Sequence, residues 1–289
     1  MKTYTKLKSS ILIILFISIA VPSIKAQPGK KYGILSYNTA INVSGKQRML
    51  TQKMTKAYLY LINNPTDMQA KKDLLTSKIM FEKKNSILLD NTKNKNTKAS
   101  IEKVHKLWGD FKKIIEETPS FDGATKIMET NTDLLKAANS VVLAIIAESK
   151  DAIMNNAEGD EDFDEELANS RLELKKIINI SGRQRMLSQR LAGYYYANQS
   201  ALKDKNLKAV LNQVFNELDG AINLFVVSDF NTTEIDEKLG SAVVQWEYFK
   251  ANSKKLFGQG FDDTDIYKRS NKLTKIFDDI TGLYEKVDL

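Results

Sequence analysis

The chain contains one fourteen-residue motif twice, and this internal repeat constrains the fold more than any other feature. Residues 41–54 read INVSGKQRMLTQKM and residues 178–191 read INISGRQRMLSQRL, so nine of the fourteen positions are identical. Weaker similarity continues downstream, where residues 131–142 correspond to residues 270–281. A repeat offset of 137 residues is too long for a solenoid unit and has the size of a domain. The sequence therefore predicts two tandem copies of one domain.

Each copy shows the pattern of four helices. Apolar residues recur at helical spacing, as at Ile127, Leu134 and Val141, and no segment keeps a period-two alternation. Only 4 prolines and 13 glycines occur in 289 residues, so helices can run long without interruption. The first helix is expected from about Gly33 to Ile62. We predict an all-α fold of two tandem antiparallel four-helix bundles.

The repeat also sets the expected domain boundaries, with bundles at residues 27–157 and 167–289 joined by an acidic segment at 158–166. Alternate acids within that segment are spaced as at the start of a calcium-binding loop. Positions six and twelve of such a loop would be Glu165 and Arg171, where glycine and glutamate are required. We interpret the segment as a solvated linker whose last acids lie at a helix N-terminus.

The N-terminus has the pattern of an export signal. Three lysines precede an apolar run at residues 11–21, and small residues follow it up to Ala26. The run is short for a membrane span, so we expect a signal peptide at residues 1–26, cleaved after Ala26, with an uncleaved anchor as the alternative. The predicted location is periplasmic or secreted.

Composition excludes most catalytic chemistry. The chain has no cysteine and one histidine, His105, which removes thiol nucleophiles and the common metal-ligand sets, so we expect no enzyme, no metal and no cofactor. Four lysines lie in the signal segment, so removing it lowers the net charge from +7 to +3, which argues against a nucleic-acid partner. His105 is expected to be packed or half-exposed. Of Tyr194, Tyr195 and Tyr196, at least one is expected to be exposed, because the three cannot share one helix face.

The repeated motif places polar and small residues on one face of a helix. Ser44, Arg48 and Gln52 follow one another at intervals of four, with Gly45 beside them. The second copy places Ser181, Arg185, Gln189 and Gly182 in the same way. A glycine in mid-helix costs about 1 kcal/mol relative to alanine. The pair therefore suggests the close approach of another helix or of a ligand.

Two interpretations of Arg48 and Arg185 stay open at this point. In the first interpretation, both form exposed or intrahelical ion pairs, as most arginines in proteins do. However, the guanidinium fork suits oxyanions, and this polar segment is better retained between the two halves than the apolar positions are. The neighbouring cations are retained in charge but not identity, as Lys46 and Arg183 show, which is typical of solvated side chains.

The motif resembles the signature of the PilJ/NarX-type sensor domain, the N-terminal domain of type IV pili methyl-accepting chemotaxis transducers and of nitrate/nitrite sensor kinases. The resemblance is specific at residues 41–54 and 178–191 and extends over both copies. It implies a periplasmic four-helix bundle that dimerises. It also implies that a motif arginine from each partner binds the anion between the two first helices, which here means Arg48 and Arg185. The nitrate sensors carry different residues around that arginine.

Duplication adds a further hypothesis. Four up-and-down helices return the chain to the end where it began, so the linker can start the second bundle parallel to the first. Arg48 and Arg185 would then face each other across a pseudo-twofold axis, and one chain would replace a homodimer. The predicted function is a non-catalytic module that binds a small ligand, such as nitrate or nitrite, and acts with a membrane sensor or envelope protein. The alternative is a structural or protein-interaction module of the envelope without a small ligand.

Overall fold

The computed structural model describes residues 31–155, 163–200, 202, 204–258 and 260–289. The predicted signal peptide, its cleavage site and most of the acidic linker lie outside these residues. The described residues form nine helices and one pair of two-residue strands. No helix among them is long and apolar enough to cross a membrane. The all-α architecture predicted from the repeat is confirmed.

The first bundle consists of α1 (Tyr37–Asn63), α2 (Met68–Asn91), α3 (Lys95–Glu116) and α4 (Phe121–Met154). Each helix begins at a residue whose side chain accepts a backbone N–H, which satisfies one of the donors left free in the first turn. These N-caps are Ser36, Asp67, Asn94 and Ser120. The four helices therefore have sharp starts joined by short connections.

The first helix begins four residues later than the sequence pattern predicts. Residues before it form a small hairpin of β1 (Lys31–Tyr32) and β2 (Leu35–Ser36). Gly33 turns this hairpin with a φ of 63°, a conformation that favours glycine. The hairpin is held to α2, because the Tyr32 hydroxyl donates to the carbonyl of Leu88 at 2.8 Å.

The second bundle consists of α5 (Glu165–Gln199), α6 (Leu207–Val226), α7 (Thr233–Ala251) and α9 (Asp263–Glu285). A short helix that the repeat did not predict, α8 (Ser253–Phe257), lies between α7 and α9. Asp164 caps α5, and Glu165 and Glu166 lie in its first turn, where the helix dipole favours acids. The end of the acidic segment therefore lies at a helix N-terminus, as expected.

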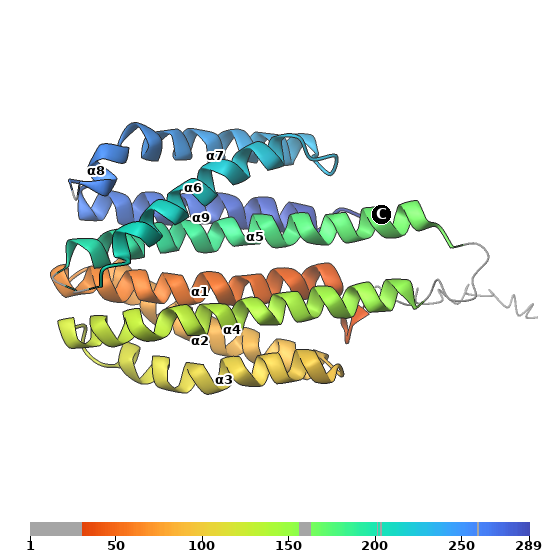
Figure 1. Cartoon of the computed structure of the whole chain (residues 1–289), viewed down its shortest axis with the longest axis horizontal. Coiled ribbons are helices and arrows are strands. Elements are labelled where there is room, and N and C mark those ends of the chain that lie inside the picture. The colour runs from red at the N-terminus through yellow and green to blue at the C-terminus, as the bar shows by residue number, and fades with distance from the viewer. Residues whose placement is uncertain (1–30, 156–162, 201, 203, 259) are drawn as a thin grey trace, which may run out of the picture.

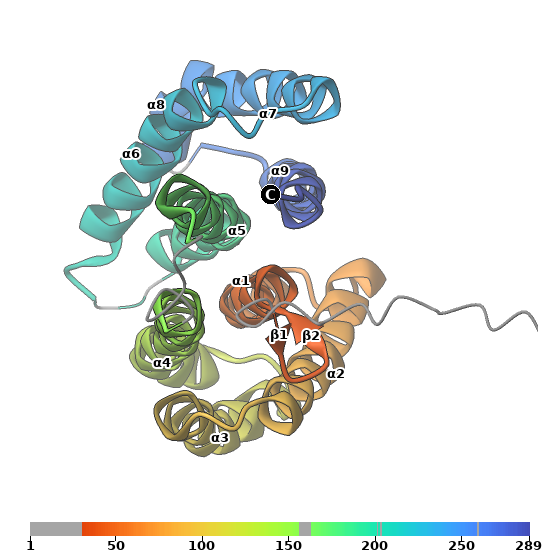
Figure 2. The ribbon, with the colours of Figure 1, turned by 90° about the vertical axis from the view of Figure 1, so that its right-hand side faces the viewer.

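The two bundles lie side by side, and α1 of one packs along α5 of the other (Figure 1). Both helices run in the same direction, and the view along them shows the pair at the centre with the remaining helices on either side (Figure 2). Because α5 contacts α1, α6 and α9, it is enclosed on several faces. Tyr194, Tyr195 and Tyr196 are all buried for this reason, and the prediction that one would be exposed is wrong.

A polar contact between the bundles surrounds the buried Lys56 of α1. Its ammonium group donates to the side chains of Asn271 at 2.7 Å and Ser270 at 3.1 Å, both on α9. It also lies 4.0 Å from the centre of the Tyr267 ring. The residue equivalent to Lys56 in the second copy is Gly193, which packs against the Lys56 backbone. Burial, with the charge of the nearby Lys53, lowers the pKa of Lys56 well below its usual value.

Replacing Lys56 with methionine should flatten the pH dependence of stability. A lysine whose pKa is lowered by folding binds fewer protons in the native state, so stability rises with pH until the unfolded lysine titrates near about 10.4. Between pH 8 and pH 9.5, the free energy of unfolding of the wild-type protein should therefore rise more steeply than that of Lys56→Met. The difference is up to about 1.4 kcal/mol per pH unit, for one proton. Urea unfolding at a series of pH values measures it.

The matched control is Lys113→Met, because the Lys113 side chain is 75% exposed. This variant should retain the wild-type slope. If the free energy of unfolding rose equally with pH in wild type and in Lys56→Met, the pKa of Lys56 would not be lowered by folding.

Candidate functional site

The repeated motif lies in the middle of α1 and α5, where the two helices face each other. Arg48 is 1% exposed and Arg185 is 0% exposed. A β-carbon placed on Gly45 would lie 3.1 Å from Nη2 of Arg185 and 3.4 Å from Nη2 of Arg48. Both guanidinium groups therefore lie beside the same glycine, and the structure brings the two predicted arginines together.

The arginines reach across the interface in a pseudo-symmetric way. Nη2 of Arg48 donates to the carbonyl of Asn179 at 3.2 Å, and Nη2 of Arg185 donates to the carbonyl of Asn42 at 3.4 Å. Asn42 and Asn179 occupy the same position of the two motifs. Each arginine thus binds the main chain of the opposite first helix, as expected of two copies related by a pseudo-twofold axis.

The glycines allow the arginine side chains to fold along their own helices. A β-carbon on Gly182 would lie 2.8 Å from Nη2 of Arg185, too close for the present arrangement. Gly182 and Gly45 each precede their arginine by three residues, which puts them on the same helix face. The mid-helix glycines are therefore explained by the close approach of guanidinium groups.

Each arginine has a second partner on the last helix of its own bundle, and here the symmetry is broken. Nη1 of Arg48 donates to Oδ1 of Asn139 at 2.8 Å, whereas Nη1 of Arg185 donates to Oδ1 of Asp278 at 2.6 Å. Residues 139 and 278 correspond in the alignment of the two copies. Arg185 therefore has a carboxylate partner where Arg48 has a neutral amide.

The electrostatics follow from this difference. Burial and the charge of Arg185 lower the pKa of Arg48 to about 9, so Arg48 still carries its charge at neutral pH. Burial also lowers the pKa of Arg185, but Asp278 opposes that effect. Burial would raise the pKa of Asp278, yet Arg185 and Lys46 outweigh it and hold the pKa below its usual value. Nε of Arg48 has no hydrogen-bond acceptor among the described residues.

The remaining predicted site residues do not join the arginine pair. The hydroxyls of Ser44 and Ser181 donate to carbonyls of their own helices, those of Ile41 and Ile178. Their small size permits the helices to approach, but their hydroxyls are already used.

The two glutamines lie one turn further along and differ from each other. Gln189 donates to Thr274 at 2.7 Å and to Asn271 at 3.0 Å, both on α9. Oε1 of Gln52 instead accepts from Arg190 of α5 at 3.0 Å. Gln52 and Gln189 therefore stabilise helix contacts at different places.

The motif cations expected to be solvated have defined partners instead. Lys46 pairs with Asp278 at 2.9 Å, and Arg183 pairs with Glu217 at 2.7 Å. The sequence reasoning treated only the first helices, so it missed Asp278 and Asn139. The alignment of residues 131–142 with 270–281 contained the signal, because it places Asp278 at the position of Asn139.

A cleft gives solvent a route to this cluster. It has a volume of about 300 Å³ and lies between α1, α2, α5 and α9. Asp278 and Gln189 line it, together with Lys53, Asn271 and Lys275. Asp278, which is 30% exposed, thus meets the solvent at this cleft.

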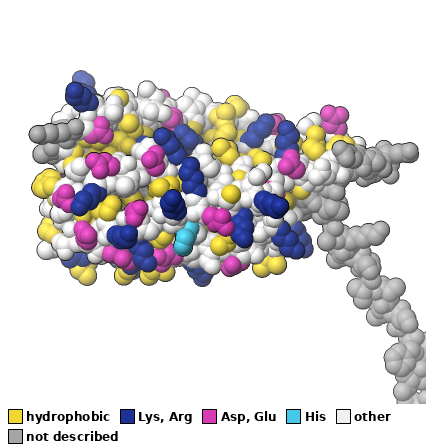
Figure 3. All heavy atoms as spheres, turned by 60° about the horizontal axis from the view of Figure 1, so that its bottom comes forward, with side chains coloured by type: hydrophobic (Ala, Val, Ile, Leu, Met, Phe, Trp, Pro, Cys, Tyr) yellow, Lys and Arg dark blue, Asp and Glu magenta, His cyan; other side chains and the backbone are white. Residues whose placement is uncertain are grey.

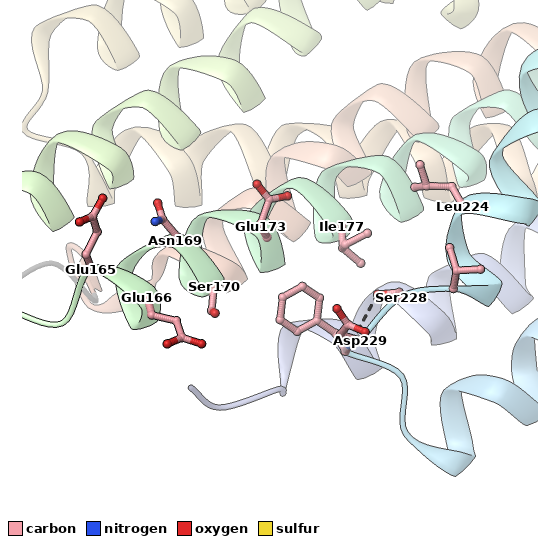
Figure 4. Close-up of a pocket in the computed structure, with 11 residues that line it drawn as sticks. Glu165, Glu166, Asn169, Ser170, Glu173, Ile177, Leu224, Ser228 and Asp229 are labelled. Atoms are coloured by element: carbon pink, nitrogen blue, oxygen red, sulfur yellow. Dashed lines mark hydrogen bonds between the residues drawn. The ribbon is translucent and has the colours of Figure 1, made fainter.

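A larger groove of about 770 Å³ lies elsewhere, between the start of α5 and the connection from α6 to α7 (Figure 4). Its lining includes four carboxylates, those of Glu165, Glu166, Glu173 and Asp229, and no lysine or arginine. It contains no residue of the repeated motif and does not suit an anion.

Other chemistry finds little support in the described part of the chain. No group of three or more metal-ligating side chains occurs among the described residues. The single histidine, His105, is exposed on the surface of α3 (Figure 3), whereas we expected it to be packed or half-exposed.

The comparison with known families gives one match. The model of the PilJ family, described as the type IV pili methyl-accepting chemotaxis transducer N-terminal domain, matches residues 34–139 and 167–266. No curated protein and no solved structure matches the chain significantly. Each matched segment lies within one of the two copies predicted from the repeat and contains its motif.

Alanine at Gly182 should destabilise the protein, although alanine is the better helix former. At the exposed Gly109, where a β-carbon would meet nothing within 4 Å, alanine should stabilise by about 0.5–1 kcal/mol. At Gly182 the β-carbon would displace a buried, hydrogen-bonded guanidinium group. We expect a loss of about 1–3 kcal/mol, as for overpacked cores. Urea unfolding of the two variants measures the contrast, and equal stabilisation by both would contradict the described position of Arg185.

Proposed function

Since the chain belongs to the PilJ family and carries two of its domains in tandem, we propose that it is an exported, non-catalytic sensor module that binds a small oxyanion. In this proposal Arg48 and Arg185 bind the anion between α1 and α5, and nitrate and nitrite are the candidate ligands. A membrane signalling partner reads the bound state. The family match supports the sensory and signalling part, and the arginine pair supports the ligand class.

The observation that carries the proposal is the charge of the buried pair. Two guanidinium groups lie side by side in the interior, and burying a charge is costly unless it is paired. Among the described residues, Asp278 is the carboxylate that bonds to either of them. The pair therefore retains a positive charge, which a bound oxyanion would compensate.

The arrangement of the bundles supports a single-chain version of a dimer site. In a homodimer, two identical first helices would meet at a twofold axis. Here α1 and α5 meet in the same direction, and their arginines cross to each other's main chain. We therefore propose a pseudo-dimer within one chain in preference to a homodimer. The domains in this proposal keep the boundaries 27–157, 158–166 and 167–289.

Export remains part of the proposal. The described helices contain no candidate membrane span, and family membership agrees with a periplasmic sensor domain. Cleavage after Ala26 would release residues 27–289 to the periplasm or the medium, where the partner would be an envelope protein.

One observation favours the rival function, an interaction module without a small ligand. Both arginines already donate to protein acceptors, and together they tie α1, α4, α5 and α9 to one another. Such a network can hold the bundles in place without any anion. The two functions differ in whether an anion stabilises the protein.

The decisive experiment is thermal unfolding of residues 27–289 against nitrate, nitrite, sulfate, phosphate and acetate, at constant ionic strength in chloride. We expect one small oxyanion to raise the midpoint in a saturable way. At a concentration of about one hundred times Kd, the gain is about 2.7 kcal/mol, or about 5 °C for a chain of this size. Arg48→Met should abolish this gain.

Arg183→Met is the matched control. Arg183 belongs to the same motif but is 42% exposed and pairs with Glu217, so its loss should leave the anion response intact. If no anion shifts the wild-type midpoint, the interaction module is the correct function. An equal loss in both variants would show that the response is general electrostatics.

A further inference from the structure

The two halves of the arginine cluster differ at one position that the repeat makes comparable. Asn139 on α4 and Asp278 on α9 both accept from Nη1 of their arginine, through Oδ1, at 2.8 Å and 2.6 Å. An amide oxygen and a carboxylate oxygen thus occupy the same place relative to each guanidinium group. At this position the two half-sites therefore differ in the charge of the acceptor, at similar hydrogen-bond distances.

A second carboxylate adds to this difference. Lys46 pairs with Asp278 and offsets part of its charge, but Glu285, near the end of α9, accepts from the side chain of Asn42. Asn42 in turn accepts from Arg185 at 2.7 Å. The residue that corresponds to Glu285 in the first copy, at the same offset as Asp278, is Ile146. The α9 side of the cluster is therefore acidic, whereas the α4 side offers Arg48 neutral acceptors.

Hydrogen-bonding capacity is distributed in the same way. Within the described residues, every nitrogen of the Arg185 guanidinium has an acceptor, because Nε donates to the carbonyl of Gly182 and the two terminal nitrogens bond to Asn42 and Asp278. Nε of Arg48 has none in that part of the chain. The unsatisfied donor and the uncompensated charge belong to the same side chain.

We propose that Asp278 is an internal carboxylate that takes one half of the anion site, so that the external ligand binds on the Arg48 side and is a small monovalent oxyanion. This inference rests on the proposed anion-binding function and specifies it. The charges of Arg185 and Lys46 are offset by those of Asp278 and Glu285, which leaves the charge of Arg48 for the ligand. A dianion would meet the negative charge of Asp278, so Asp278 acts as a specificity-determining residue.

The position of Asp278 agrees with this role. It lines the cleft between α1, α2, α5 and α9, and it is the cluster member that is partly exposed there. An anion that entered by this cleft would meet the carboxylate before it met either arginine. Asp278 therefore stands between solvent and the buried pair, where it disfavours ligands of higher charge.

The test exchanges the two equivalent residues. Asp278→Asn gives both arginines a neutral amide acceptor, as Asn139 already is for Arg48, so this variant uses a pairing the fold accommodates. Nitrate affinity, measured by titration calorimetry, should increase about tenfold or more, as expected when a charged hydrogen-bond competitor is removed. Sulfate, which should not stabilise the wild-type protein, should now raise the thermal midpoint.

Asn139→Asp is the reverse exchange. It gives Arg48 a carboxylate, so the midpoint without added anion should rise and the nitrate response should disappear. Asp279→Asn is the matched control, because Asp279 is adjacent in sequence but pairs with Lys238 and Lys275, away from the arginines. Its nitrate affinity and its response to sulfate should equal those of the wild-type protein.

The outcomes separate this inference from the function on which it rests. If nitrate binds wild type and Asp278→Asn equally, and sulfate still fails to bind, the role of Asp278 is overturned while anion binding stands. If nitrate binds neither protein, anion binding itself fails. If it binds Asp278→Asn alone, Asp278 fills the site completely in the wild-type protein, which supports the inference and contradicts the proposed function of the native chain.

Discussion

The structure depends on the packing of α1 against α5, two helices that carry a polar face into the interior. Ordinary bundle helices bury an apolar stripe and leave a polar face to water. Here the polar face of each motif meets that of the other, so its groups must find partners inside the protein. Arg48 and Arg185 meet this requirement by bonding to the main chain of the opposite helix and to a side chain on α4 or α9. The two bundles are thereby held in one register.

Joining both copies in one chain frees them from being identical. A homodimer must place the same residue at both equivalent positions. It therefore cannot use a side chain for which the interface has room only once. This chain uses that freedom twice where its two bundles meet. Lys56 fills space against Gly193, its counterpart in the other copy, and Asp278 is charged where Asn139 is neutral. One lysine side chain and one carboxylate thus occupy an interface that a symmetric dimer would have had to fill with pairs.

The sequence predicts what the repeat and local chemistry determine. Apolar spacing and the retained motif were sufficient for two helical bundles and for parallel first helices that bring Arg48 near Arg185. The failures occur where a residue's surroundings come from segments distant in the sequence. Tyr194 to Tyr196 were judged on a helix with one buried face, but α5 contacts α1, α4, α6 and α9. The hairpin before α1 depends on contacts with α2 some 56 residues away, such as the bond from Tyr32 to Leu88, which local pattern does not reveal.

The same packing constrains how an anion would produce a signal under the proposed function. A ligand beside Arg48 would add its binding free energy to the contact between α1 and α5, because that contact forms the site. Anion binding and bundle packing would then be thermodynamically coupled. An anion that bound one packing arrangement more tightly than another would shift the equilibrium between the two arrangements. In a homodimer the shift can separate the subunits, whereas here the chain keeps both bundles together at any concentration. Under the proposed function, the readable change would therefore be the relative placement of the outer helices, and a partner that spans both bundles would be able to detect it.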